Sequence, residues 1–475
     1  MKNKRPVAKP NPGNQAESKP GGDGGARIFS ILFGLFFGLS LLKFGNLVLI
    51  EAWKPGALSQ VTNPNSRTVA QSMIDWPTSG WEWALNSWPV IIGYWVLIGL
   101  AVFGIVAARW KFNTPRSLMA LPAAWLVWQF VSATHSLDAN LTGTALKHFA
   151  ASVACFYLGL FALSRIANLN GFLTGLLAGF FLVLADGLVQ QFGGLEETRK
   201  QFMLYVYPTL TSPNPELLKR MTSTRIFSTL FYPNALAGAI LLCLPPLLGF
   251  AWELKRQFTI GARTLLLALI GLPALGCLFW SGSKGGWLLL LLLGLIALLQ
   301  LKFERKWKIA LVTVVLLGGL AGFAVRYSGY FQKGATSVSA RFDYWRAAVQ
   351  TAGENPVFGT GPGTFEIPYH KIKRPEAEMA RLTHNDYLQQ ASDSGVPGFI
   401  FYAAFIVGGL IWTGRRVVRT GGLPFAIWLG VLGWALQSLM EFGLYIPALA
   451  WLAFALLGWL EGTQGNPVDK PKATS

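Results

Sequence analysis

The stretch GWLLLLLLGLIALLQL (286–301) decides the fold of this chain, because nearly every residue in it is apolar and no polar face is left along the helix. A second run, IFSILFGLFFGLSLLKFGNLVLI (28–50), has the same character. Both are near or above the roughly 17–25 residues that cross a bilayer as a helix. Strands of a membrane barrel would instead alternate apolar and polar residues. The sequence therefore predicts an all-α polytopic membrane protein.

The composition agrees with this class. Of 475 residues, 52% are hydrophobic and 13% are charged, whereas soluble domains carry about 25% charged residues. The net charge of +18 does not indicate nucleic-acid binding, because the basic residues lie at the ends of the apolar runs, as membrane topology requires. Cys155, Cys243 and Cys277 lie inside apolar runs without CxxC or Cys/His spacing, so we expect small buried side chains and neither a metal nor a cofactor.

About twelve membrane-spanning helices are predicted. They cover residues 28–50, 89–108, 117–134, 147–163, 171–192, 228–250, 264–280, 286–301, 309–325, 396–413, 423–440 and 444–460. An even number puts both termini on one side, and Lys and Arg concentrate in the short loops of that side, so the positive-inside rule places both termini in the cytoplasm.

The resulting organisation has five parts. We expect a disordered basic cytoplasmic tail (1–27), nine spans (28–325), an outward polar loop (326–396), three spans (397–460) and a cytoplasmic tail (461–475). The glycine-rich break SGSKGG (281–286) is read either as a tight turn or as a re-entrant dip. The large loop between spans nine and ten is basic although it faces outward, which topology does not require, so we expect it to be functional.

A histidine in this loop is the candidate catalytic group. His384 lies in THNDYLQQASDSGVPG (383–398), close to the start of an apolar span. Histidine titrates near neutrality and can take a proton from a hydroxyl. The alternative is an interfacial histidine that only satisfies hydrogen bonds. If it is a base, either Asp386 or Asp393 is a candidate to orient its imidazole.

Three cations are predicted on the same outer face. Arg341 lies in SARFDYWRAA (339–348), on one helical face with Tyr344, and its planar fork suits phosphate; the alternative is a solvated charge on an interfacial helix. Arg225 precedes a span, and Lys284 lies in SGSKGG without the spacing of a nucleotide-binding loop. Cations beside a general base are what transfer from a polyprenyl-diphosphate sugar needs.

Charges inside the spans are few. Lys43 is expected to snorkel toward the interface. Asp186 and Glu441 lie near the outer ends of their spans, where a functional and a structural role both remain open. An ion-coupled transporter would usually carry more buried carboxylates and broken half-helices. The glycines of PVFGTGPGTF (356–365) are expected to form a tight turn that orders the loop.

Four segments together resemble the O-antigen ligase and polymerase superfamily. They are RIFSTLFYPNALAGA (225–239), FWSGSKGGWLLLL (279–291), RFDYWRAAVQTAGENPVFGTGPGTF (341–365) and HNDYLQQASDSGVPGFIFY (384–402). The resemblance implies metal-independent transfer of a glycan from an undecaprenyl-diphosphate donor to an acceptor glycolipid or glycan, at the periplasmic face of a bacterial inner membrane. It implies His384 as the base and Arg341, Lys284 and Arg225 as diphosphate ligands. The family usually has arginine where this chain has Lys284, and more often glutamate where it has Asp393.

The acceptor is not fixed by the superfamily. We expect an O-antigen ligase-like glycosyltransferase that delivers glycan to lipid A-core or a similar acceptor. The alternatives are an O-antigen or exopolysaccharide polymerase and a protein O-oligosaccharyltransferase. A lipid-linked glycan flippase is an alternative of another class, and it predicts a cationic cavity that continues along the spans.

Overall fold

The structure is a computed structural model in which residues 23–51, 79–107, 116–201, 203–204, 207, 222–332, 336–375 and 377–464 are described. Within these residues the regular elements are helices and none is a strand, which confirms the all-α class. The tails predicted at 1–22 and 465–475 lie outside the described residues. The neighbouring residues 23–27 and 461–464 are helical.

Each predicted span overlaps one long helix of the described chain. These helices are α1 (Asp23–Lys43), α5 (Val90–Ala107), α6 (Arg116–Ala133), α7 (Ala139–Phe161), α8 (Asn170–Val189), α11 (Pro233–Glu253), α12 (Ile260–Ser281), α13 (Lys284–Gln300), α14 (Arg305–Gln332), α17 (Asp386–Thr420), α18 (Gly422–Gln437) and α19 (Pro447–Gln464). Eight helical segments of the described residues are long and apolar enough to cross a membrane, whereas α6, α13, α18 and α19 are shorter apolar helices. A crossing by all twelve remains a prediction.

Short elements connect the bundle. They are η1 (Val48–Glu51), α4 (Gly80–Leu85), η3 (Leu163–Arg165), η4 (Gln190–Gly194), α9 (Leu195–Gln201), η7 (Ser228–Leu230), η8 (Leu254–Arg256), α15 (Thr336–Glu354), α16 (Glu366–Ile372) and η9 (Gly443–Tyr445).

Close helix packing builds the core. Helix α1 packs along α8, α7 along α19, and α11 along α18. Glycine allows the closest approach: a Cβ at Gly159 of α7 would collide with the backbone carbonyl of Ala455 on α19. Small residues at such crossings are typical of membrane helices, which gain stability from backbone proximity and close packing. The three cysteines are free and buried in this core, as expected.

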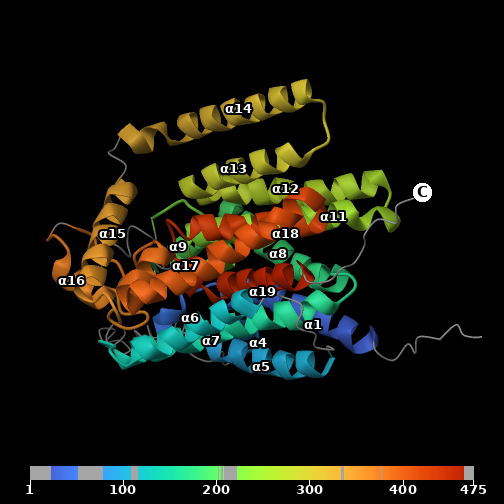
Figure 1. Ribbon diagram of the computed structural model, residues 1–475. Helices are drawn as coiled ribbons and strands as arrows, with labels where there is room; N and C mark the ends of the chain where they lie inside the picture. Colours follow the sequence, from blue (N-terminus) through green and yellow to red (C-terminus); the bar gives the residue numbers. More distant parts are fainter. Residues whose placement is uncertain are drawn as a thin grey trace, which may run out of the picture.

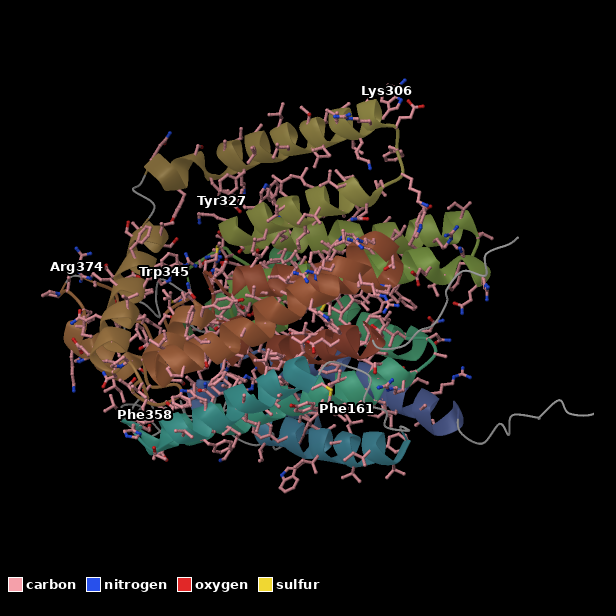
Figure 2. All side chains as sticks on the ribbon, in the orientation of Figure 1. Phe161, Lys306, Tyr327, Trp345, Phe358 and Arg374 are labelled. Carbon is pink, nitrogen blue, oxygen red and sulfur yellow. The ribbon has the colours of Figure 1, made fainter. Side chains whose placement is uncertain are left out.

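The polar loop gathers at one end of the bundle. Helices α15 and α16 lie beside the first turns of α17 at that end, whereas α1 begins and α19 ends at the opposite end (Figure 1). Figure 2 shows Arg374 at the loop end and Lys306 at the far end of α14. Helix α14 also continues to Gln332, past the span end expected at Val325. The arrangement places the polar loop at the end of the bundle opposite the start of α1 and the end of α19.

Helix α17 carries the loop into the bundle. It is two helical segments joined at Gly395, where φ is 70° and ψ is −178°. Polar side chains before this kink are buried against α6: Trp125 Nε1 and Gln129 Nε2 donate to Gln390 Oε1 at 2.8 and 3.0 Å, and Ser394 Oγ donates to Gln129 Oε1 at 2.7 Å. The polar QQASDS sequence therefore anchors the helix that follows His384.

Candidate active site

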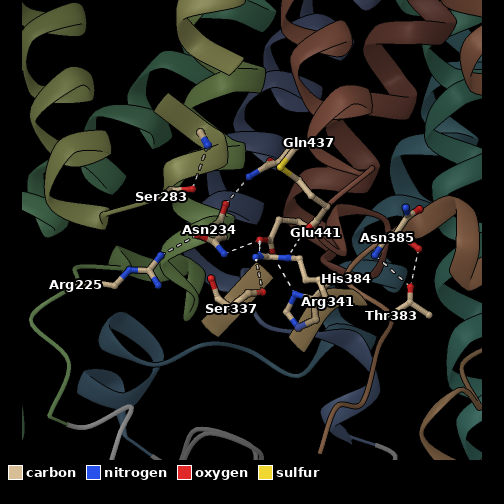
Figure 3. Close-up of polar contacts among 12 residues, drawn as sticks. Arg225, Asn234, Ser283, Ser337, Arg341, Thr383, His384, Asn385, Gln437 and Glu441 are labelled. Atoms are coloured by element: carbon tan, nitrogen blue, oxygen red, sulfur yellow. Dashed lines mark hydrogen bonds and ion pairs between the residues drawn. The ribbon is translucent and has the colours of Figure 1, made fainter. Parts of the chain in front are cut away.

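Glu441 is the centre of a polar network at the loop end of the bundle (Figure 3). One of its oxygens, Oε1, accepts from Asn234 Nδ2 at 2.6 Å and forms an ion pair with Arg341 Nη2. The other, Oε2, lies 3.3 Å from Nδ1 of His384. Because a carboxylate only accepts, Nδ1 must carry the hydrogen in this contact. Glu441 therefore contacts both the candidate base, His384, and a candidate phosphate ligand, Arg341.

Arg225 joins the network through Asn234. Its Nη2 donates to Asn234 Oδ1 at 2.8 Å, and its Nε donates to the Ser281 carbonyl at 2.6 Å. That carbonyl ends α12, where Gly282 takes a left-handed conformation (φ 61°) and Ser283 caps α13 by accepting from the Gly286 N–H at 3.2 Å. The glycine-rich break is thus a tight turn, and it holds Arg225.

The same turn presents Lys284. Its Nζ lies 3.8 Å from the ring centre of Tyr330 and 5.3 Å from that of Tyr327, both on α14. Arg326 lies one residue before Tyr327, and the charges of Arg225, Arg341 and Arg326 are all close enough to act on Lys284. Four cations therefore surround a site whose central charge is one carboxylate.

His384 is held in an unusual backbone conformation. Its φ is 52°, a left-handed geometry that costs a non-glycine residue about 1–3 kcal/mol and clusters at functional sites. On either side, Thr383 Oγ1 donates to the Asn385 carbonyl at 2.7 Å, and Asn385 caps α17 by accepting from the Leu388 N–H at 3.0 Å. The imidazole packs against the Phe442 ring, with 4.8 Å between centres. These contacts fix the ring beside Glu441.

Arg341 reaches the network from α15. Arg341 lies on the helical face of α15 that packs inward: Tyr344 and Ala348 are buried, and the Arg341 side chain is 18% exposed. Its Nε donates to the Met440 carbonyl at 3.0 Å and its Nη1 to the Ser337 carbonyl at 3.3 Å. With the Glu441 pair, three of its five N–H groups have partners among the described residues. Two remain for a ligand.

Neither aspartate expected to orient the imidazole does so. Asp386 Oδ2 accepts from the Leu444 N–H at 2.8 Å, and Asp393 Oδ2 accepts from the Gly363 N–H and Gln389 Nε2, both at 2.8 Å. Both side chains are fully buried and join the loop to the helices. The hypothesis of an aspartate partner for His384 is wrong, because these positions of α17 face the bundle. Glu441 takes that role.

The glycine-rich turn orders the loop, in line with its interpretation from sequence. Gly359, Gly361 and Gly363 all have positive φ, at 67°, 102° and 81°. The Gly361 N–H donates to the Asp393 carbonyl at 2.8 Å, next to the carboxylate bond at Gly363. The turn is hydrogen-bonded to Asp393 of α17, and it contributes no group to the network around Glu441.

The network's electrostatics follow from its charges. Burial alone would raise the pKa of Glu441, but Arg341, the hydrogen bond and charge of His384, and Arg225 together lower it below the ordinary value of 4.5. Burial lowers the pKa of Arg225, which the charge of Glu441 opposes. Glu441 therefore stays ionised near neutral pH and presents a negative charge to the His384 ring.

The structure brings together residues that the sequence keeps apart. His384, Arg341 and Arg225 share one network, and Lys284 lies next to it. Sequence reasoning missed the central position of Glu441; the available signal was a lone carboxylate near the end of an apolar span. Asn234, which bridges Arg225 to Glu441, gave no signal beyond its place after Pro233 at the start of α11.

Residues 265–403 match the family model described as O-antigen ligase. The match covers less than a third of the chain, and over this segment the chain is similar to the O-antigen ligase family. This family is enzymatic and glycosyltransferase-like. The O-antigen ligase match includes Lys284, Arg341 and His384, whereas Arg225 and Glu441 lie on either side of it and join the site through the fold.

A Haemophilus influenzae protein described as uncharacterized is also similar to this chain. It is 32% identical over 144 residues, which cover 25% of this chain and 36% of that protein. The chain thus spans about a third of the length of this relative, whose description assigns no activity. The likeness to the O-antigen ligase family therefore rests on the segment 265–403.

Proposed function

We propose that this protein is an O-antigen ligase-like glycosyltransferase, which moves a glycan from undecaprenyl diphosphate to an acceptor hydroxyl at the periplasmic face of the inner membrane. The observation that carries the proposal is the Glu441 network, in which one histidine and one arginine share a single carboxylate. A base and a cationic phosphate site in contact match the two tasks of the reaction.

The transfer step uses these groups directly. The acceptor hydroxyl oxygen forms a bond to the anomeric carbon, while the bond from that carbon to the diphosphate oxygen breaks and its electron pair leaves with the carrier. His384 Nε2 takes the hydroxyl proton, since Nδ1 faces Glu441. The Glu441 carboxylate stabilises the resulting imidazolium, and it fixes the tautomer that exposes Nε2 as acceptor.

The leaving diphosphate requires cations. Arg341 and Arg225 keep N–H groups for it, and Lys284 adds a point charge from the start of α13. The carrier's apolar tail has a path beside them. The apolar stretch of α14 has no residue buried inside the described protein. Helix α14 contacts α13, where Trp287 Nε1 donates to the Gly319 carbonyl at 3.3 Å. A polyprenyl chain can therefore approach Lys284 along these helices from the bilayer.

The choice of acceptor is tested in cells. A strain that lacks a ligase accumulates long carrier-linked polymer, whereas a strain that lacks a polymerase caps its surface with single repeats. We expect deletion of this gene to give the first outcome, restored by the wild-type chain and not by the His384→Ala variant. Single-repeat caps would show a polymerase. Donor trapped on the cytoplasmic side, with transfer intact when donor is supplied directly to the periplasmic face, would show a flippase.

A further inference from the structure

A cavity of about 1080 Å³ opens at the end of the bundle opposite His384. Its walls come from α1, α8, the end of α11, the start of α12 and the η3 turn. Helix α8 runs from the cavity to the other end of the bundle. Its last turns lie near Arg225, where Ser228 Oγ donates to the Val183 carbonyl at 2.7 Å. At 1.5 Å per residue, Asn170 at the cavity lies about 28 Å from Val189 along the same helix.

The cavity changes from polar to apolar along its walls. Arg27 on α1 and Asn170 on α8 line its mouth, and eight residues further along each helix Leu35 and Ala178 line it still. It therefore follows the helices for about 12 Å. Leu35 is 47% exposed although it points into this space, so the described protein leaves an apolar channel uncovered there. A hydrocarbon chain suits these walls.

Two cations mark the mouth of the cavity. Arg27 and Arg165 are its charged lining residues, and no carboxylate lines it within the described part of the chain. Arg165 comes from η3, directly after α7, while Arg27 comes from the first turns of α1. The cavity thus offers two positive charges from separate elements above an apolar channel. Basic pockets between membrane helices on the cytoplasmic side bind anionic lipid headgroups.

We propose that this cavity binds an anionic glycerophospholipid, with its phosphate at Arg27 and Arg165 and an acyl chain along α1 and α8. The two charges distinguish it from general contact with the bilayer, which needs only apolar walls. The site is separate from the transfer reaction, since none of the residues around Glu441 lines the cavity.

Native mass spectrometry of the full chain with added lipid tests the proposal. The probes are phosphatidylglycerol and phosphatidylcholine with identical acyl chains. We expect the wild type to prefer phosphatidylglycerol, and each of Arg27→Gln and Arg165→Gln to weaken its binding about fivefold, or roughly 25-fold together, from about 1 kcal/mol for each basic residue. Phosphatidylcholine, whose choline cation offsets the phosphate charge, should lose less than about twofold in affinity.

Two further variants make the test specific. Lys255→Gln with Arg256→Gln removes two exposed cations at the same end that do not line the cavity, and phosphatidylglycerol binding should persist. Ala178→Phe fills the channel from an exposed position without changing charge, and it should weaken binding of the same lipid. Equal binding of both lipids by the wild type, or equal losses in the control pair, would overturn the proposal.

Discussion

Replacing Glu441 by Gln removes the charge at the centre of the network and keeps its size. The imidazolium formed at His384 would lose a carboxylate whose Oε2 lies 3.3 Å from Nδ1. Unit charges about 4 Å apart interact with about 4 kcal/mol near a protein surface. The His384 side chain is 30% exposed, and we take about half of that value, ~2 kcal/mol, to allow for screening by water. The expected loss is about 30-fold in kcat.

The assay is single-turnover transfer in nanodiscs, from a polyprenyl-diphosphate glycan to an acceptor at saturating concentrations. Glu461→Gln is the matched control, because Glu461 is also a buried carboxylate but lies at the end of α19 opposite the site. Its transfer rate should equal that of the wild type. If Glu441→Gln retained kcat within threefold of the wild type, the carboxylate would not act on His384 and the reasoning would fail.

Three further predictions follow from the same contacts. Arg341→Lys keeps the charge but loses the fork that binds Glu441 and Met440, so the donor KM should rise about tenfold or more; an unchanged KM in steady-state transfer would contradict this. Gly395→Ala places a Cβ against the Val357 carbonyl at a φ of 70°, so the thermal unfolding midpoint should fall by several degrees, whereas Gly408→Ala on the same helix, with open space around it, should not lower it comparably. The lowered pKa of Glu441 means that its ion pairs stabilise the fold above pH 4.5 and are lost as pH falls through the lower folded value; the difference in stability between wild type and Glu441→Gln, measured by denaturant unfolding, should therefore shrink as the pH falls below 4.5.

The helices could be predicted from sequence because apolar runs are a direct consequence of the bilayer. Their ends were less predictable. Helix α17 begins at Asp386 and not near Val396, because its first turns are polar yet buried against α6, and Gly395 then redirects the chain. Hydropathy predicts a solvated loop for QQASDS, because it does not report the hydrogen bonds that join Gln390 and Ser394 to α6.

The site was partly predictable for a related reason. His384 and Arg341 stood out as a titratable and a cationic group in a polar loop that topology did not require. Glu441 lies 57 residues beyond His384, and only the return of the chain through α18 brings the two together. Asp386 and Asp393 were nearer in sequence, but helix geometry turns both into the bundle.

The most direct test of the central claim is the transfer rate of the His384→Ala variant in nanodiscs with saturating donor and acceptor, together with its donor affinity. If His384 is the base, kcat should fall by about 100-fold or more while the donor still binds with wild-type affinity, because the cations remain. Transfer at the wild-type rate by a variant that binds donor normally would contradict the account.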